Sequence, residues 1–254
     1  MRALEKERKK NLKSSMERKH ESVTTGFDQG WQISDISNLS ETAMKDAQSR
    51  WDRVAKPLHS LGLLEDALVR IAGIQETSQI DLTKRALVIM CADNGVVEEG
   101  VTQTGQEVTA VVAENFLEGT TTCCVMCRQC GAELFPVDVG MVTDTKVRTD
   151  LKVAYGTRNM TREPAMTRDQ AIRGIEAGIA MAEELKDKGY QVLATGEMGI
   201  GNTTTSSAVA AVLLGKPVED MTGRGAGLTM IPVIIFRGTD LHLHPIIKQG
   251  FTYN

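Results

Sequence analysis

The chain has 254 residues, of which 41% are hydrophobic and 4% aromatic, and it carries a net charge of −4 with a pI near 5.7. This length and hydrophobic content can supply the core of one large α/β domain or two small ones, and they argue against wholesale disorder. The acidic balance argues against a general nucleic-acid-binding protein, and the scarcity of aromatic residues argues against a stacking platform for single strands.

The sequence contains no apolar run of the roughly 18–20 residues that a bilayer span requires. The basic N-terminus lacks the apolar segment of a secretory signal. All five cysteines lie between Cys91 and Cys130, and this spacing differs from that of an evenly spread disulfide framework. We therefore expect a soluble, cytoplasmic enzyme with small-molecule substrates, which binds neither nucleic acid nor membrane.

Residues 1–32 differ in composition from the rest of the chain. They are rich in Lys and Arg, have few large apolar residues, and end in a polar stretch of Ser, Thr and Gly. The segment is either an arm that binds nucleic acid or a membrane surface, or a solvated extension. Because no aromatic residues accompany the charge, we predict a disordered basic extension at 1–32 and a globular domain at 33–228.

Two helices are predicted at the start of the globular domain. Ser40–Ala43 opens the first helix, and Lys56–Gly62 (KPLHSLG) breaks the helical pattern. A second helix follows, and one of its faces is expected to be formed by Leu64, Leu68, Ile71 and Ala72.

Strands and helices then alternate along the chain. Strands are predicted at 85–92, 131–140 and 190–195, the first and last of them buried, and a further helix at 202–214. This alternation predicts an α/β fold with a parallel sheet and right-handed crossovers.

Two capping-box signatures predict helix starts within this region, at Thr104–Glu107 and Thr167–Gln170. The second helix should end at Gly189. The apolar residues at helical spacing are Val108, Val111, Val112 and Phe116 in the first helix, and Ile172, Ile175, Ile179 and Ala182, expected to face inward, in the second.

The loops at the carboxyl ends of the strands are candidates for a ligand site, because parallel sheets bind ligands there. The loop at 196–204 (GEMGIGNTT) combines glycines, which let backbone N–H groups approach an anion, with the start of a helix. It predicts a phosphate or carboxylate site; the alternative is a tight turn whose glycines serve packing. The loop has neither the Lys-Ser/Thr of a P-loop nor the dinucleotide-binding order of glycines.

A second glycine-rich loop, at 222–227, contains Arg224, which could bind phosphate oxygens through its guanidinium group. Taken alone, this second signal has low specificity, because surface turns often combine glycines with one arginine.

Carboxylates in these loops are candidates for acid–base chemistry or for binding hydroxyl groups. Each could instead be a helix cap or a surface residue. Glu197 is the leading candidate because it lies inside the predicted anion loop; since it would repel a phosphate, we expect it to face another part of the substrate. The full set is Asp93, Glu98, Glu99, Asp138 and Glu197.

The cysteines at 124, 127 and 130 have the spacing of an iron–sulfur motif. They also lie in a predicted helix after Gly119, where this spacing places them on one small-residue face. No Cys-Pro follows, so we favour buried helix cysteines and expect neither a metal nor a cofactor.

A series of ordered segments resembles the nicotinate-nucleotide–dimethylbenzimidazole phosphoribosyltransferase family. The most specific is the loop at 196–204. The complete series is 56–62, 72–75 (AGIQ), 92–96 (ADNGV), 99–101, 106–109 (QEVT), 115–116, 137–140 (VDVG), 156–159 (GTRN), 164–166, 196–204 and 222–225 (TGRG).

The resemblance implies a three-layer α/β/α fold, with a parallel sheet flanked by helices and a small helical part from the N-terminal region, in a homodimer. It implies transfer of ribose 5-phosphate from nicotinate mononucleotide to 5,6-dimethylbenzimidazole. The products are α-ribazole 5′-phosphate, for the nucleotide loop of cobalamin, and nicotinate, with no essential metal. Displacement inverts the anomeric carbon, and a general base removes the benzimidazole proton.

The resemblance also assigns residues to the substrates. The 93–106 region, including Asp93 and Gln106, would line the benzimidazole pocket, and Glu197 would lie against the ribose and base. The residues that would hold the ribose phosphate are Gly199, Gly201, Asn202, Thr203, Thr222, Gly223, Arg224 and Gly225.

The chain departs from the family pattern in three places. Asn94 stands where the family usually has His, and Thr and Cys replace small apolar residues after Gly119. Residues 229–254 form an atypical tail that does not reproduce the family's phosphate lysine or its general-base glutamate. A frameshift would explain this tail; its His242 and His244 are either a metal or base site or residues without a role. We therefore also consider a catalytically impaired protein that only binds a nucleotide or a benzimidazole.

Overall fold

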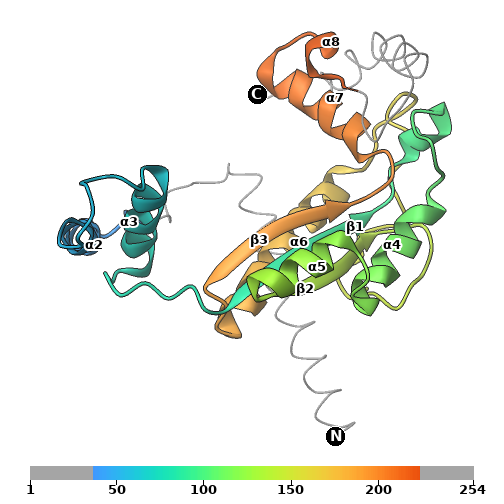
Figure 1. Ribbon diagram of the computed structural model, residues 1–254. Coiled ribbons are helices and arrows are strands. Elements are labelled where there is room, and N and C mark those ends of the chain that lie inside the picture. The colour runs from blue at the N-terminus through green and yellow to red at the C-terminus, as the bar shows by residue number, and fades with distance from the viewer. Residues whose placement is uncertain (1–36, 224–254) are drawn as a thin grey trace, which may run out of the picture. The chain divides into compact units, whose positions relative to one another are not determined.

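The computed structural model describes residues 37–223, and the chain divides into two compact units, Met1–Thr83 and Lys84–Asn254 (Figure 1). The predictions for residues 1–32 and 229–254 therefore lie outside the described residues. Within residues 37–223, no helix is both long enough and apolar enough to cross a membrane.

The first unit contains the two predicted helices, α2 (Glu41–Asp52) and α3 (Leu63–Gln75). The start of α2 is confirmed, since the Ser40 hydroxyl accepts a hydrogen bond from the Ala43 amide at 3.3 Å. A small core cluster of Ala47, Val69 and Ala72 joins the helices.

The predicted apolar face of α3 is wrong at Leu64, which is 55% exposed, whereas Ala72 is buried and Leu68 and Ile71 are half-buried. The buried residues of α3 include Ala72 and Gly73, and a Cβ atom at Gly73 would lie 2.8 Å from the Met44 side chain. These small residues let α2 approach α3 closely. Glu65 is buried on the same helix, with its carboxylate 2.8 Å from the Lys56 ammonium group.

The second unit is built on a parallel sheet of β1 (Arg85–Ala92), β2 (Ala132–Gly140) and β3 (Val192–Met198), in the order β2-β1-β3. The parallel arrangement is confirmed. The prediction that the third strand is buried is wrong, because Leu193 is 40% exposed. In the described part of the chain β3 pairs only with β1, so it forms an edge of the sheet.

Helices cover both faces of this sheet, which confirms the three-layer prediction (Figure 1). In that view α4 and α5 lie in front of the strands and α6 lies behind them. The helices of the second unit are η2 (Gly95–Glu99, a 3₁₀ helix), α4 (Glu107–Glu118), α5 (Thr122–Cys130), α6 (Arg168–Asp187), α7 (Asn202–Leu214) and α8 (Val218–Met221).

One of the two capping-box predictions is confirmed. At the start of α6, the Gln170 amide donates to the Thr167 hydroxyl at 3.2 Å, and the Gln170 side chain accepts from the Thr167 amide at 2.8 Å. The box at Thr104–Glu107 is wrong, because α4 begins after Gln106 without a side-chain cap. The Gln106 carboxamide instead donates to the Asn94 carbonyl at 3.1 Å, so the residue serves a contact between loops.

The predicted inward face of α6 is confirmed in part. Ile172 is buried and Ile179 is half-buried, but Ile175 is 45% exposed and Ala182 is exposed. In α4, Val111 is 58% exposed and the buried residues are small. The buried sets are Ile172, Ala177, Met181 and Leu185 in α6, and Thr109, Ala110 and Ala113 in α4.

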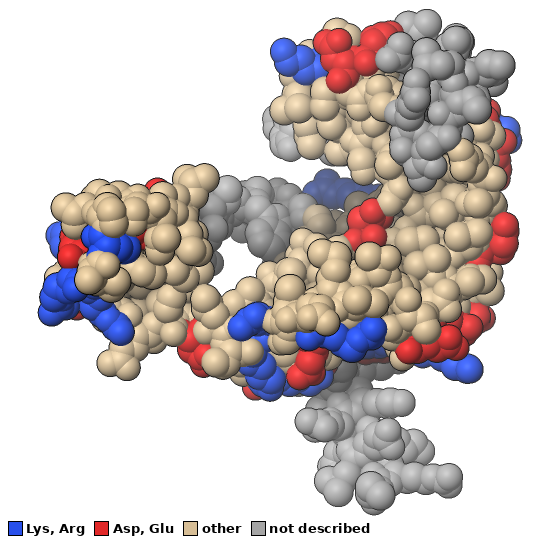
Figure 2. All heavy atoms as spheres, in the orientation of Figure 1, with Lys and Arg blue, Asp and Glu red and all other residues tan. Residues whose placement is uncertain are grey.

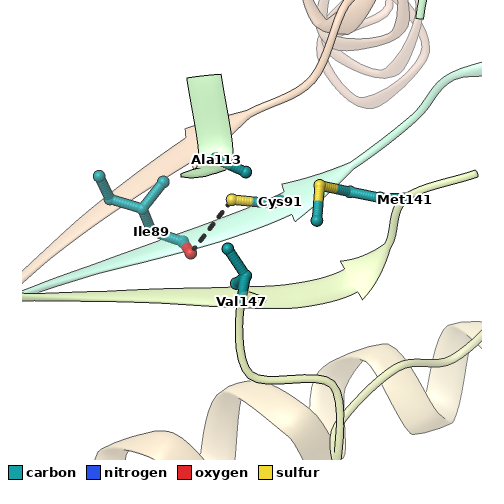
Figure 3. Close-up of a cluster of buried hydrophobic side chains, with 5 residues drawn as sticks. All are labelled: Ile89, Cys91, Ala113, Met141 and Val147. Atoms are coloured by element: carbon teal, nitrogen blue, oxygen red, sulfur yellow. Dashed lines mark hydrogen bonds between the residues drawn. The ribbon is translucent and has the colours of Figure 1, made fainter. Parts of the chain in front are cut away.

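A compact core cluster lies between β1 and α4 (Figure 3). Cys91 is fully buried there, and its thiol contacts the Ile89 carbonyl at 3.8 Å. Burial, reinforced by the nearby Asp138 carboxylate, raises the pKa of the Cys91 thiol to about 12. Cys91 is therefore a structural thiol. The cluster consists of Ile89, Cys91, Ala113, Met141 and Val147.

The cysteines of α5 are free thiols. Cys124 and Cys127 are buried, which confirms the packing interpretation for them, whereas Cys130 is exposed and the interpretation is wrong there. No group of three or more His, Cys, Asp or Glu residues within 37–223 is arranged to hold a metal.

A buried ion pair holds the end of β2. Asp138 is fully buried; one carboxylate oxygen accepts from the amides of Gly140 and Met141, and the other lies 3.1 Å from the Lys152 ammonium group. Burial alone would lower the pKa of Lys152, but its bonds to Asp138 and Asp144 outweigh this effect and raise the pKa. The raised pKa keeps Lys152 positively charged at neutral pH, next to the buried Asp138 side chain.

Removal of the cation from this pair should destabilise the fold. Lys152→Met leaves a buried carboxylate without its partner, and we expect a loss of about 3–5 kcal/mol in the free energy of unfolding. Lys146→Met, at an exposed neighbouring position, should change it by less than about 0.5 kcal/mol. Urea denaturation of both variants measures the difference; equal midpoints would contradict the stabilising role of the pair.

Candidate functional site at the carboxyl end of the sheet

The loops that follow β1 and β2 are joined around Asp93, which is 1% exposed. The Asp93 amide donates to the Gly140 carbonyl at 2.9 Å, and its carboxylate accepts from the Val142 amide at 2.8 Å. Its carbonyl accepts from the Thr157 amide at 3.0 Å. The structure therefore places this predicted pocket residue at the junction of three loops, with its carboxylate buried among them.

The glycines after β3 lie against the loop that follows β1. A Cβ atom at Gly199 would lie only 2.1 Å from the Ala92 carbonyl oxygen. A Cβ atom at Gly201 would lie 2.9 Å from the Val97 side chain, and Gly201 has a positive φ of 88°. Close approach of two loops thus requires both glycines, so packing accounts for them whether or not an anion binds.

The start of α7 presents polar groups beside these glycines. The Asn202 side chain accepts from the Thr203 amide at 2.7 Å and donates to the Glu197 carboxylate. Glu197 and Thr203 are exposed, whereas Asn202 is partly buried. A negative charge near a helix N-terminus is favourable, so the electrostatics of this end of α7 suit an anion as well as the Glu197 carboxylate.

The second predicted phosphate loop is described only in part. The Thr222 hydroxyl donates to the Val218 carbonyl at 2.7 Å, at the end of α8, and Gly223 is exposed. Arg224 and Gly225 lie outside the described residues.

The candidate carboxylates Glu98 and Glu99 belong to η2 and face the 156–163 loop. Glu99 accepts hydrogen bonds from the Asn159 side chain at 2.6 Å and the Thr161 hydroxyl at 3.1 Å, and Arg162 lies 3.0 Å away. The bond from Asn159 makes the largest contribution to lowering the Glu99 pKa below its usual value. Glu98 is exposed and lies 3.3 Å from Arg162. These contacts hold the two loops together.

Sequence reasoning missed three polar residues that connect the loops. The Thr109 hydroxyl in α4 is fully buried and accepts from the Ile200 amide at 3.1 Å. The Asn94 side chain donates to the Ile200 carbonyl at 3.1 Å and accepts from the Thr205 hydroxyl at 2.9 Å. Thr109 could have been found from the sequence, because it is a polar residue within an apolar helix face. The hydrogen bond between Asn94 and Thr205 could not, because it joins residues far apart in the chain and leaves no local pattern.

On the face shown in Figure 2, basic and acidic side chains of the described residues are interspersed, and they do not gather into one basic surface. This face therefore lacks the basic surface that would attract a polyanion.

Comparisons with known proteins show which family the chain resembles. A family model described as phosphoribosyltransferase matches residues 36–231. The nicotinate-nucleotide–dimethylbenzimidazole phosphoribosyltransferase of Clostridium acetobutylicum is 46% identical over 199 residues, which cover 78% of this chain and 56% of the relative. The enzyme of the same name from Ruminiclostridium cellulolyticum is 47% identical over 199 residues, with the same coverage of 78% and 56%.

A solved structure shows the same similarity in three dimensions. The crystal structure of CobT from Thermus thermophilus matches with a TM-score of 0.74 and 36% identity, covering 79% of this chain and 61% of that one. The chain thus spans little more than half the length of the curated relatives it matches.

The close approach at Gly201 can be tested against the glycine at the other end of α7. Gly215 also has a positive φ, of 60°, but open space surrounds its missing Cβ. We expect Gly215→Ala to cost about 1–2 kcal/mol of stability from backbone strain alone. Gly201→Ala should cost about 1–3 kcal/mol more, because its Cβ also meets the Val97 side chain. Thermal and urea unfolding of the two variants measures the stability that each has lost. Equal losses would contradict the close approach of Gly201 to Val97.

The lowered pKa of Glu99 predicts a pH-dependent contribution to stability. Because the folded pKa lies below the usual 4.5, this contribution is present above about pH 4.5 and is lost as the pH falls through the folded pKa. Glu99→Gln should therefore be less stable than the parent protein at pH 7, and the difference should shrink as the pH falls below about 4. Glu98→Gln, at an exposed position, should have a smaller effect at pH 7. Unfolding curves of the parent protein and both variants across this pH range test the prediction. A stability difference between the parent and Glu99→Gln that stays constant with pH would count against the hydrogen-bond network around Glu99.

Proposed function

The chain belongs to the nicotinate-nucleotide–dimethylbenzimidazole phosphoribosyltransferase family, and on this premise we propose that it transfers ribose 5-phosphate from nicotinate mononucleotide to 5,6-dimethylbenzimidazole. The products would be α-ribazole 5′-phosphate and nicotinate, as needed for the nucleotide loop of cobalamin. The observation that carries the proposal is the N-terminus of α7, where Asn202 and Thr203 follow directly on the turn at Gly199–Gly201.

In this proposal the phosphate of the substrate binds at the start of α7. The positive end of the helix dipole attracts a dianion, and backbone amides at the first turn supply hydrogen bonds. The exposed Thr203 hydroxyl and the Asn202 carboxamide lie at the same end. Thr222 and Gly223, together with Arg224 and Gly225, are proposed to complete the phosphate site from the second glycine-rich loop.

The ribose and the two bases would lie beside this end of α7 and the loop after β1, which are packed against each other. Nicotinate leaves readily because its ring nitrogen is cationic in the mononucleotide. The incoming benzimidazole nitrogen attacks the anomeric carbon from the opposite face, so the bond to nicotinate breaks as the new bond forms and the configuration inverts from β to α. The benzimidazole must lose its N–H proton, which requires a base.

Glu197 is our candidate for that base. It is exposed beside α7, whereas the carboxylates of Asp93 and Asp138 are buried in contacts between loops. Gln106 and the Asp93 region are proposed to line the benzimidazole pocket, where the Gln106 carboxamide holds the Asn94 carbonyl. Neither a metal nor a cofactor enters the proposed step.

One observation favours a second candidate function, binding of a nucleotide or a benzimidazole without turnover. The Glu197 carboxylate already accepts a hydrogen bond from the Asn202 side chain, so it takes part in holding the start of α7. If this bond persists in the complex, the carboxylate is occupied by Asn202, and the site holds its ligand without transfer.

We further propose that the active protein is a cytoplasmic homodimer, in which residues 33–228 form the phosphoribosyltransferase part. Size-exclusion chromatography with light scattering tests the dimer.

The transfer itself is tested by incubating the purified chain with both substrates and following α-ribazole 5′-phosphate by chromatography. We expect Glu197→Gln to lower turnover by about 10²–10⁴-fold, the usual contribution of a general base, while nicotinate mononucleotide still binds. Glu118→Gln, at an exposed position near the end of α4, is the matched control and should leave turnover unchanged. Turnover unaffected by Glu197→Gln would remove Glu197 as the base, and binding without product in the parent protein would favour the second function.

A further inference from the structure

Asn94 connects the loop after β1 to the glycine turn before α7. Its side-chain amide donates to the Ile200 carbonyl at 3.1 Å, and its side-chain oxygen accepts from the Thr205 hydroxyl, in the first turns of α7, at 2.9 Å. The residue is partly buried. One carboxamide thus uses both its donor and its acceptor on a single segment more than a hundred residues away.

The Ile200 residue is held on both sides of its backbone. Its amide donates to the buried Thr109 hydroxyl at 3.1 Å, and its carbonyl accepts from Asn94. The peptide planes on either side of Ile200 are therefore both fixed by side chains from other elements. Such a bonded peptide cannot rotate without breaking a hydrogen bond.

The bond from Asn94 sets the direction of the next amide. In a trans peptide the carbonyl and the N–H point in opposite directions, and the structure contains no cis peptide among its described residues. Because the Ile200 carbonyl points toward Asn94, the Gly201 N–H points away from it. Gly201 is the N-cap residue of α7, so this N–H belongs to the helix end at which an anion is favoured.

Asn94 is itself held in place. Its carbonyl accepts from the Gln106 carboxamide at 3.1 Å. A Cβ atom at Gly199 would lie 3.1 Å from the Asn94 side-chain nitrogen Nδ2, so glycine at 199 leaves room for this side chain.

We propose that Asn94 is a positioning residue for phosphate binding: it holds the Ile200 carbonyl so that the Gly201 N–H is directed at the phosphate of the substrate. This inference rests on the proposed function for the identity of the ligand. Asn suits the role because its side chain carries a donor and an acceptor. Asp would keep the acceptor for Thr205, lose the donor to Ile200 and add a negative charge near the anion.

The test compares variants by calorimetric titration with nicotinate mononucleotide, inorganic phosphate and dimethylbenzimidazole. We expect Asn94→Ala to lower the affinity for nicotinate mononucleotide and for inorganic phosphate by about 5–10-fold, the effect of one hydrogen bond. Asn94→Asp should lower both affinities further. Binding of dimethylbenzimidazole should weaken less, because the contact of Asn94 with the proposed benzimidazole pocket is the bond from Gln106 to its backbone carbonyl, which the substitutions keep. Gln48→Ala, which removes an exposed carboxamide bonded to Asp52 in α2, is the matched control and should bind every ligand as the parent does.

Calorimetry also separates positioning from a loss of folded protein. A positioning role raises the dissociation constant at unchanged stoichiometry, whereas simple destabilisation lowers the stoichiometry at unchanged affinity. A lowered stoichiometry at unchanged affinity would overturn the proposal. Asn94 variants that weaken the binding of dimethylbenzimidazole alone would also overturn it. Thr205→Val, which removes the donor to the Asn94 oxygen and leaves the Ile200 bond, should weaken phosphate binding by less than Asn94→Ala.

Hydrogen exchange distinguishes a failure of this inference from a failure of the proposed function. In the free protein, Asn94→Ala should speed exchange in residues 199–206 while β1 exchanges as before, and unchanged exchange there would contradict the positioning role. If the parent protein binds neither nicotinate mononucleotide nor phosphate, the proposed function is overturned. In that case the Gly201 N–H has no phosphate to bind, and the inference falls as well.

Discussion

The close approach between the turn after β1 and the turn after β3 is the constraint on which the site depends. The two strands are parallel neighbours, with Cys91 opposite Met198, so the chain leaves the sheet at the same edge in both. The turns can then pack only if the second has no side chains at its points of contact, and Gly199 and Gly201 meet that condition. Once the turns are in contact, the start of α7 is placed beside the loop after β1, where polar side chains connect the two.

The charged groups divide into those that hold the loops and those left for chemistry. Asp93 and Asp138 are buried, and their carboxylates accept hydrogen bonds from backbone amides at the end of β2 and in the turn that follows. These two residues therefore have a structural role, although they lie at the carboxyl end of the sheet. Glu99 serves the same purpose for the 156–163 loop. Glu197 differs because it is exposed beside α7, and it is the carboxylate that our proposed chemistry uses.

The sequence predicted the strands and α7 well, because continuous apolar runs and a glycine-bounded helical pattern are local signals. It predicted the buried helix faces less well: in α3 and α4 small residues such as Gly73 and Ala113 are buried, whereas Leu64 and Val111 are exposed. In α6 the buried residues are Ile172, Ala177, Met181 and Leu185, and Ile175 is exposed. For the site, the glycine turn was predicted, but the bonds of Asn94 to Ile200 and Thr205 were not. They join residues far apart in the chain, so only the folded arrangement reveals them.

The central claim is that the N-terminal turn of α7 receives the phosphate of nicotinate mononucleotide. Glycine-selective ¹⁵N labelling with a titration of nicotinate mononucleotide tests it most directly, since the amide signals of Gly199 and Gly201 report on one end of α7 and that of Gly215 on the other. The account predicts a saturable shift of the Gly201 signal, with Gly215 unchanged. Saturable binding that leaves the Gly201 signal in place would contradict it.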